Sequence, residues 1–205
     1  MLKLFYAPGT CALASRIALE EAGAPYELVR VDFSKGEQRG ADYLKINPKG
    51  RVPALSTDRG VLTENPAILA YIAQSFPAAK LAPLDDAFAF GQVQAFNAYL
   101  ASTVHVAHAH GPRGSRWADD PAAIAEMKRK VPETVAACFE LIEAALPQDG
   151  GWVMGAQYTI CDPYLFTIAS WLESDGVDVT RFPKVLDHRN RMAERSAVKK
   201  AQAAS

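Results

Sequence analysis

The sequence has few cysteines, no long apolar run and no excess of charge of either sign. Its 205 residues include three cysteines, and no CxxC spacing occurs, so neither a disulfide framework nor a cysteine zinc site is indicated. No apolar stretch approaches the roughly 20 residues of a membrane span, and the first residues lack the pattern of a signal peptide. The 22 basic and 23 acidic side chains nearly balance, which argues against nucleic-acid or anionic-membrane binding. These absences predict a cytoplasmic protein whose partner is a small molecule or another protein.

The first 75 residues alternate between strand and helix patterns. Asn65 and Pro66 suit the N-cap and the first position of a helix, and Gly60 suits a hairpin turn. We expect strands at 2–6, 26–33, 54–57 and 61–63, and helices at 11–22, 40–46 and 65–74. The predicted order is βαβαββα.

The rest of the chain reads as helical. Residues 77–86 contain two prolines and no periodicity, as in a linker, and long helices are expected at 87–109 and 121–146. Thr159 and Asp162 form a capping-box pattern before an apolar helix that should be buried. A last helix is expected at 184–195, followed by a frayed alanine-rich tail. We therefore predict an α/β domain (1–76), a linker (77–86) and an all-helical domain (87–205).

Cys11 follows a Pro-Gly turn and opens the first predicted helix. Free amides and the helix dipole at such a position favour a thiolate and lower the thiol pKa. A free cysteine is equally often a small buried hydrophobe. The position alone leaves both interpretations open.

Two further stretches suit an extended or zwitterionic ligand. In "RVPAL" the Val52–Pro53 bond is a candidate cis peptide that would expose the Val52 backbone, although a trans proline on an edge strand is the commoner arrangement. In "TENPAI" the helix N-terminus favours an anionic group of a ligand, and the Glu64 carboxylate beside it favours a cationic one. Helix capping by Asn65 is the alternative explanation of this motif.

The histidines of "HVAHAH" invite a metal interpretation. His105 and His108 share a helix face, but His110 does not, and no carboxylate or cysteine lies among them. A histidine in a binding site at position 105 is the better interpretation, and we expect no metal site.

Taken together, "PGTCALAS", "INPKGRVPAL" and "LTENPAI", followed by helices with "LASTVH" and "TICDPYLF", resemble the cytosolic glutathione transferases, most closely the bacterial beta class. The resemblance covers essentially the whole chain. It implies a thioredoxin-like domain joined to a helical domain, a homodimer, and glutathione as a co-substrate with no resident cofactor. The second substrate would be a small hydrophobic electrophile bound between the domains.

The resemblance also implies roles for individual residues. Cys11 would contact the glutathione sulfur or form a mixed disulfide with it, with His105 and Thr10 near that sulfur. Pro53 would be the cis-proline. The remaining glutathione contacts would be Lys35, Val52, Glu64, Asn65 and Ser102, the last across the dimer interface.

The chain departs from the family pattern at several positions. Position 65 is asparagine where serine is usual, and Ala12, Ala98 and Val106 replace a serine, an asparagine and a basic residue. The main hypothesis is a glutathione S-transferase that conjugates hydrophobic electrophiles or exchanges disulfides. The alternative is a glutathione-binding carrier with little turnover. A thioredoxin-like oxidoreductase is disfavoured because no second cysteine follows Cys11 at CxxC spacing.

Overall fold

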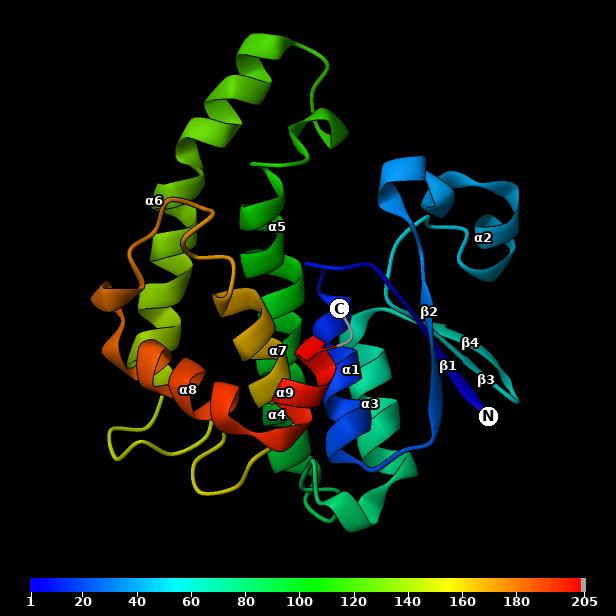
Figure 1. Ribbon diagram of the computed structural model, residues 1–205. Helices are drawn as coiled ribbons and strands as arrows, with labels where there is room; N and C mark the ends of the chain where they lie inside the picture. Colours follow the sequence, from blue (N-terminus) through cyan, green and yellow to red (C-terminus); the bar gives the residue numbers. More distant parts are fainter. Residues whose placement is uncertain (204–205) are drawn as a thin grey trace.

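A computed structural model describes residues 1–203, and its N-terminal half contains a four-stranded mixed sheet (Figure 1). The strands lie in the order β2-β1-β3-β4. Strand β1 pairs in parallel with β2 and antiparallel with β3, and β3 and β4 form the predicted hairpin. The bounds are β1 (Leu2–Tyr6), β2 (Tyr26–Arg30), β3 (Ala54–Thr57) and β4 (Gly60–Thr63). Strand β2 is shorter than predicted, because the Asp32 carboxylate accepts a hydrogen bond from the Ser34 N–H and starts a 3-10 turn.

Helices cover both faces of the sheet. Leu4 and Leu55 point to the face covered by α1 and α3, whereas Phe5 and Ala54 point to the face where Tyr43 of α2 packs. This alternation follows from the two-residue period of a strand. The helical segments are α1 (Ala12–Glu21), η1 (Phe33–Lys35), η2 (Glu37–Arg39), α2 (Ala41–Ile46) and α3 (Asn65–Ser75). The observed order confirms the predicted βαβαββα unit.

The second half is helical, as predicted. The stretch expected as one helix at 87–109 is continuous but includes a π-helical segment, η4, between α4 and α5. The elements of the second half are η3 (Pro77–Ala79), α4 (Ala87–Tyr99), η4 (Leu100–Val104), α5 (His105–Ala109), η5 (Gly114–Arg116), α6 (Pro121–Ala145), α7 (Cys161–Ala169), η6 (Val179–Arg181), α8 (Pro183–Glu194) and α9 (Ser196–Ala203).

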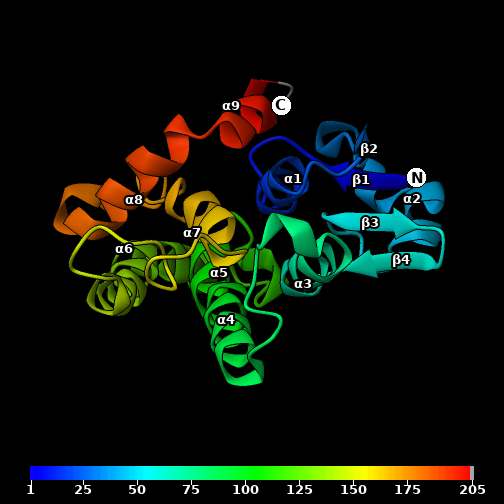
Figure 2. The ribbon, with the colours of Figure 1, turned by 90° about the horizontal axis from the view of Figure 1, so that it is seen from below.

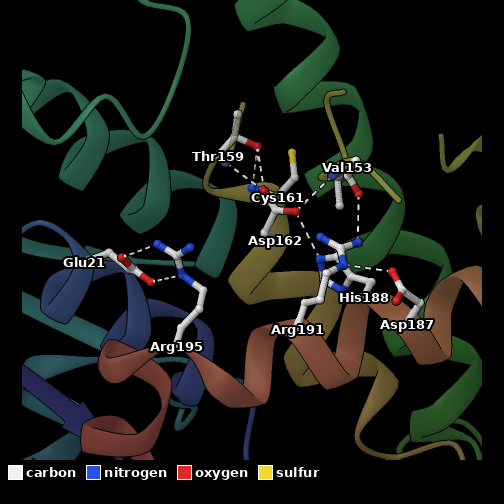
Figure 3. Close-up of polar contacts among 10 residues, drawn as sticks. Glu21, Val153, Thr159, Cys161, Asp162, Asp187, His188, Arg191 and Arg195 are labelled. Atoms are coloured by element: carbon white, nitrogen blue, oxygen red, sulfur yellow. Dashed lines mark hydrogen bonds and ion pairs between the residues drawn. The ribbon is translucent and has the colours of Figure 1, made fainter. Parts of the chain in front are cut away.

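Helix α7 lies at the centre, and all nine of its residues are buried, which confirms the prediction for this segment. Asp162 accepts hydrogen bonds from the N–H groups of Thr159 (2.7 Å) and Val153 (2.9 Å). Its Oδ1 also lies 3.0 Å from Nε2 of the buried His188 on α8 (Figure 3). The carboxylate therefore performs its predicted capping role and also joins the preceding loop to α8, a connection that the sequence pattern did not indicate.

The C-terminal segment corrects one prediction. Residues 196–203 form helix α9, which packs against α1, and Val198 and Ala201 are completely buried there (Figure 2). Just before α9, the Arg195 guanidinium binds both oxygens of Glu21 on α1, at 2.5 and 2.8 Å (Figure 3). The tail predicted to fray is therefore docked, apart from residues 204–205, which lie outside the described part.

The two halves share one buried cluster, which runs from Leu4 and Ile68 to Phe139 and Leu165. Helix α1 takes part in it from the first half by packing on both α3 and α7. Within residues 1–203, no helix combines the length and apolar character needed to cross a membrane.

Candidate active site

Cys11 lies at the N-cap position of α1 and is 9% exposed. Its Sγ donates a weak hydrogen bond to the Val52 carbonyl at 3.6 Å. Burial raises the pKa of the Cys11 thiol to about 12, and the nearby Glu64 carboxylate also raises it. Of the two interpretations that the sequence leaves open, the structure of the ligand-free protein favours the buried thiol, because removing a thiolate from water costs more free energy than the helix terminus returns. Cys11 is a neutral thiol.

Thr10 uses its hydroxyl within its own turn. The Oγ1 donates to the Ala7 carbonyl at 2.7 Å and accepts weakly from the Ala12 N–H at 3.4 Å. The side chain therefore holds the turn that presents Cys11.

The Val52–Pro53 peptide bond is cis, as the resemblance implied. The preceding carbonyl, that of Arg51, accepts hydrogen bonds from the Tyr43 hydroxyl (2.7 Å) and the Asn47 amide (2.6 Å), so the loop is held from two sides. Among residues 1–203 the Val52 N–H has no hydrogen-bond partner. The loop thus offers a fixed backbone donor beside the Cys11 thiol.

Glu64 occupies an unusual backbone conformation at the start of α3, with φ 71° and ψ 124°. Non-glycine residues held at positive φ are strained and occur often at ligand sites. The side chain is exposed and forms an ion pair with Lys49, which also donates to the Thr63 hydroxyl. A carboxylate is thus held beside the free amides of a helix N-terminus.

Asn65 corrects a second prediction. Glu64, not Asn65, is the N-cap, and Asn65 is the first residue of α3. The buried Asn65 amide accepts from the Ser15 hydroxyl at 2.5 Å and donates to the Cys11 carbonyl at 2.7 Å. Both of its polar atoms are therefore used to join α3 to the start of α1, and only the backbone N–H of Asn65 remains for a ligand.

His105 begins α5 and packs against Trp171, with ring centroids 5.0 Å apart. Burial lowers its pKa to about 4, and the neighbouring His108 and Arg113 lower it further, so its imidazole is neutral at pH 7. Trp171 also stacks on His108 at 4.4 Å, and the His108 Nδ1 lies 2.8 Å from the buried carboxylate of Asp175. Residues 1–203 contain no group of three or more His, Cys, Asp or Glu side chains suited to a metal ion.

Two predicted contacts have other partners in the structure. Lys35 is exposed and pairs with Asp32 at 3.4 Å. Ser102 is exposed on η4, and its hydroxyl donates to the Ala98 carbonyl at 2.8 Å. Within a single chain, neither side chain is engaged at the Cys11 site.

Several residues around the site were not predicted. Trp171 and Asp175 support the histidines from more than sixty positions away in the chain, which no local spacing indicates. Arg51 and Arg113 contribute to the electrostatics of both Cys11 and His105. The sequence signal for this charge after α5 is the arginine of "GPRGS", Arg113.

The fold and the site define a class of proteins in which a thioredoxin-like domain presents a thiol, a cis-proline edge and a charged helix N-terminus to a helical domain. Comparison with known proteins identifies the family. The N-terminal domain of glutathione S-transferase matches residues 1–74, and its C-terminal domain matches residues 114–204. The chain belongs to the glutathione S-transferase family.

Individual relatives are similar over nearly the full chain. Glutathione S-transferase GstA of Escherichia coli O157:H7 is 36% identical over 206 residues, covering 99% of this chain and 98% of the relative. A Sulfitobacter glutathione transferase homologue, solved with bound glutathione, has a TM-score of 0.95 at 45% identity and covers 100% and 98% of the two chains. A beta-class enzyme of Sphingomonas chungbukensis has a TM-score of 0.86 at 34% identity, with 98% of each chain covered.

Proposed function

We propose that this protein is a glutathione S-transferase that binds glutathione at the Cys11 site and transfers its sulfur to an electrophile. The observation that carries the proposal is the junction of Cys11, Val52 and the α3 N-terminus. The Cys11 thiol donates a hydrogen bond to the Val52 carbonyl, and the Cys11 carbonyl accepts a hydrogen bond from the Asn65 side-chain amide. The kinship with glutathione S-transferases favours an enzyme over the carrier alternative.

Each part of the tripeptide has a suitable partner in this arrangement. The free Val52 N–H and its carbonyl suit the cysteinyl backbone of glutathione, as an added strand suits an open edge. The γ-glutamyl carboxylate suits the backbone amides at the start of α3, and its ammonium group suits the Glu64 carboxylate. Lys35 is assigned to the glycyl carboxylate. Ser102 is assigned to a glutathione contact made from a second subunit.

The conjugation step requires the glutathione sulfur as a thiolate. The thiol proton passes to water, the sulfur electron pair forms a bond to the electrophilic carbon, and the leaving group departs with its bonding pair. When glutathione binds, the single S–H of the neutral Cys11 turns from the Val52 carbonyl, which then accepts from the ligand backbone, and donates to the thiolate, while the neutral His105 supplies a second polar contact. Thr10 acts by holding the turn. This assignment favours hydrogen bonding over a mixed disulfide as the main role of Cys11.

The test compares Cys11→Ser with Cys11→Ala. A serine hydroxyl keeps a donor at the site, so we expect Cys11→Ser to keep most conjugating activity with 1-chloro-2,4-dinitrobenzene. Cys11→Ala should lose about tenfold in kcat, the worth of one hydrogen bond to a charged group. Both variants should lose exchange with glutathione mixed disulfides. Equal conjugation by Cys11→Ala and wild type would assign Cys11 to disulfide exchange instead.

A homodimer in the cytoplasm, with a role in detoxification, completes the proposal. Phe88 at the start of α4 is 78% exposed, and Leu84 just before it is 40% exposed. An exposed apolar pair at this end of α4 supports an interface that includes α3 and α4. All three cysteines are free and buried, as suits a reducing compartment. By light scattering at micromolar concentration, the wild type should have the mass of a dimer. Phe88→Ser should have a lower average mass, because its dimer dissociates more.

A further inference from the structure

We propose that four arginines beside the Cys11 site bind an anionic group, most simply a carboxylate, on the electrophile that receives the glutathione sulfur. This inference rests on the proposed function and names its substrate class. The residues are Arg39, Arg51, Arg113 and Arg116.

The four side chains come from three segments that meet at one end of the molecule. The Arg113 guanidinium carbon lies 5.9 Å from the centre of the Phe33 ring, so a side chain of the segment after α5 contacts the first domain. Figure 1 shows this segment facing the loops before α2. Arg116 follows Arg113 in the same turn, with its N–H bonded to the Arg113 carbonyl at 3.0 Å.

Arg51 and Arg39 are held on the opposite side of this junction. Arg51 directly precedes Val52, whose carbonyl accepts a hydrogen bond from the Cys11 thiol. The Arg51 carbonyl accepts hydrogen bonds from Tyr43 and Asn47, which fix this part of the loop. A Cβ added at Gly50 would lie 3.0 Å from the Gln38 carbonyl oxygen. The loop that carries Arg39 therefore packs directly against the loop that carries Arg51.

The four arginines have no ion-pair partner in the described part of the chain. None of them forms an ion pair with any residue in 1–203, and the same holds for Arg30 and Arg59, whereas Arg129, Arg181, Arg189, Arg191 and Arg195 each do. Partial burial lowers the pKa of Arg116, and the charges of Arg113, Arg51 and Arg39 lower it further. Gathering like charges without an ion-pair partner is unfavourable in the free protein, and an anionic ligand relieves the repulsion.

Glutathione accounts for only part of this charge. One of its two carboxylates is assigned to the start of α3, so a single glycyl carboxylate remains for Lys35 and four arginines. Arg113 and Arg116 also belong to the helical half, in the segment that follows His105 and α5. An acidic group on the second substrate suits this position, with the apolar body of the electrophile toward Trp171.

The experiment compares 4-chloro-3,5-dinitrobenzoate with its methyl ester as electrophiles. In both, the glutathione sulfur bonds to the ring carbon, chloride leaves with the C–Cl pair and the thiol proton passes to water. For Arg113→Gln and Arg116→Gln we expect KM for the benzoate to rise about tenfold each, the worth of one charge-assisted hydrogen bond. KM for the ester and for glutathione should stay within about twofold. Arg59→Gln, an exposed arginine in the β3–β4 turn, is the matched control.

Equal effects on benzoate and ester, or a change confined to the KM for glutathione, would overturn the proposal. If the wild type conjugates neither compound, the proposed function fails, but the anion site is still tested by equilibrium binding. Fluorescence of Trp117, next to Arg116, reports titration with the unreactive pair 3,5-dinitrobenzoate and 3,5-dinitrobenzamide. Tighter binding of the benzoate than of the amide supports the site if this difference disappears both at high salt and in the Arg113→Gln/Arg116→Gln double variant. Equal binding of acid and amide refutes it.

Discussion

The buried Cys11 thiol allows a quantitative prediction about its reactivity in the ligand-free protein. Its pKa is raised from the ordinary value of 9.0 to about 12, mainly because burial withdraws the thiolate from water. Each unit of pKa changes the thiolate fraction tenfold below the pKa, so the shift of about three units leaves about a thousandth of the ordinary thiolate population at neutral pH. Alkylation of Cys11 by iodoacetamide should be slower by about that factor, and limited accessibility slows it further.

The assay is the rate of carbamidomethylation from pH 6 to pH 10.5, read at each cysteine by peptide mass spectrometry. The rate at Cys11 should rise about tenfold per pH unit with no plateau below about pH 10.5. The same protein unfolded in urea is the control, and there Cys11 should show an ordinary thiol profile. A plateau with a midpoint below pH 8.5 in the folded protein would refute the reasoning, because it would mean that the helix terminus outweighs burial.

Two further predictions concern stability. Asp162→Ala removes the acceptor for two buried N–H groups and for His188, and should lower the free energy of unfolding by about 3–5 kcal/mol. Asp178 is an exposed N-cap of η6, and the control Asp178→Ala should lower the free energy of unfolding by about 1 kcal/mol. Denaturant unfolding measures both variants. His105 has a pKa of about 4 in the fold against an ordinary 6.5, so between these pH values the unfolded chain binds more protons, and stability falls as the pH drops through that window. His105→Gln should weaken this pH dependence by up to about 3 kcal/mol, and unchanged pH profiles would contradict the shift.

The fold followed closely from local patterns. The alternation of Leu4 and Phe5 toward opposite faces, the hairpin at Gly60 and the apolar surround of α7 are all visible as sequence periods. The errors have physical causes as well. Helix α9 was missed because its stability comes from burying Val198 and Ala201 against α1, a contact that alanine-rich local sequence does not indicate.

The sequence named Cys11, Val52 and the start of α3 as site residues, and the fold brings these residues together, but it changes the chemistry expected of them. A helix terminus is a local property, and it suggested a lowered thiol pKa at Cys11. Burial is a property of the packed chain, and it raises that pKa. For the same reason Asn65, whose letter suits an N-cap, instead uses its amide to bind Ser15 and the Cys11 carbonyl.

The sequence by itself therefore determined the βαβαββα unit, the helical half, the family and the positions of Cys11, Val52, Pro53 and Glu64, because each depends on short-range pattern or motif. Only the tertiary structure decided that Cys11 is a neutral thiol, that Asp175 and Trp171 support the histidines, and that arginines from three segments gather without an ion-pair partner among residues 1–203. Solvation and electrostatics depend on distances between residues far apart in the chain. Those distances exist only once the two halves pack around α1 and α7.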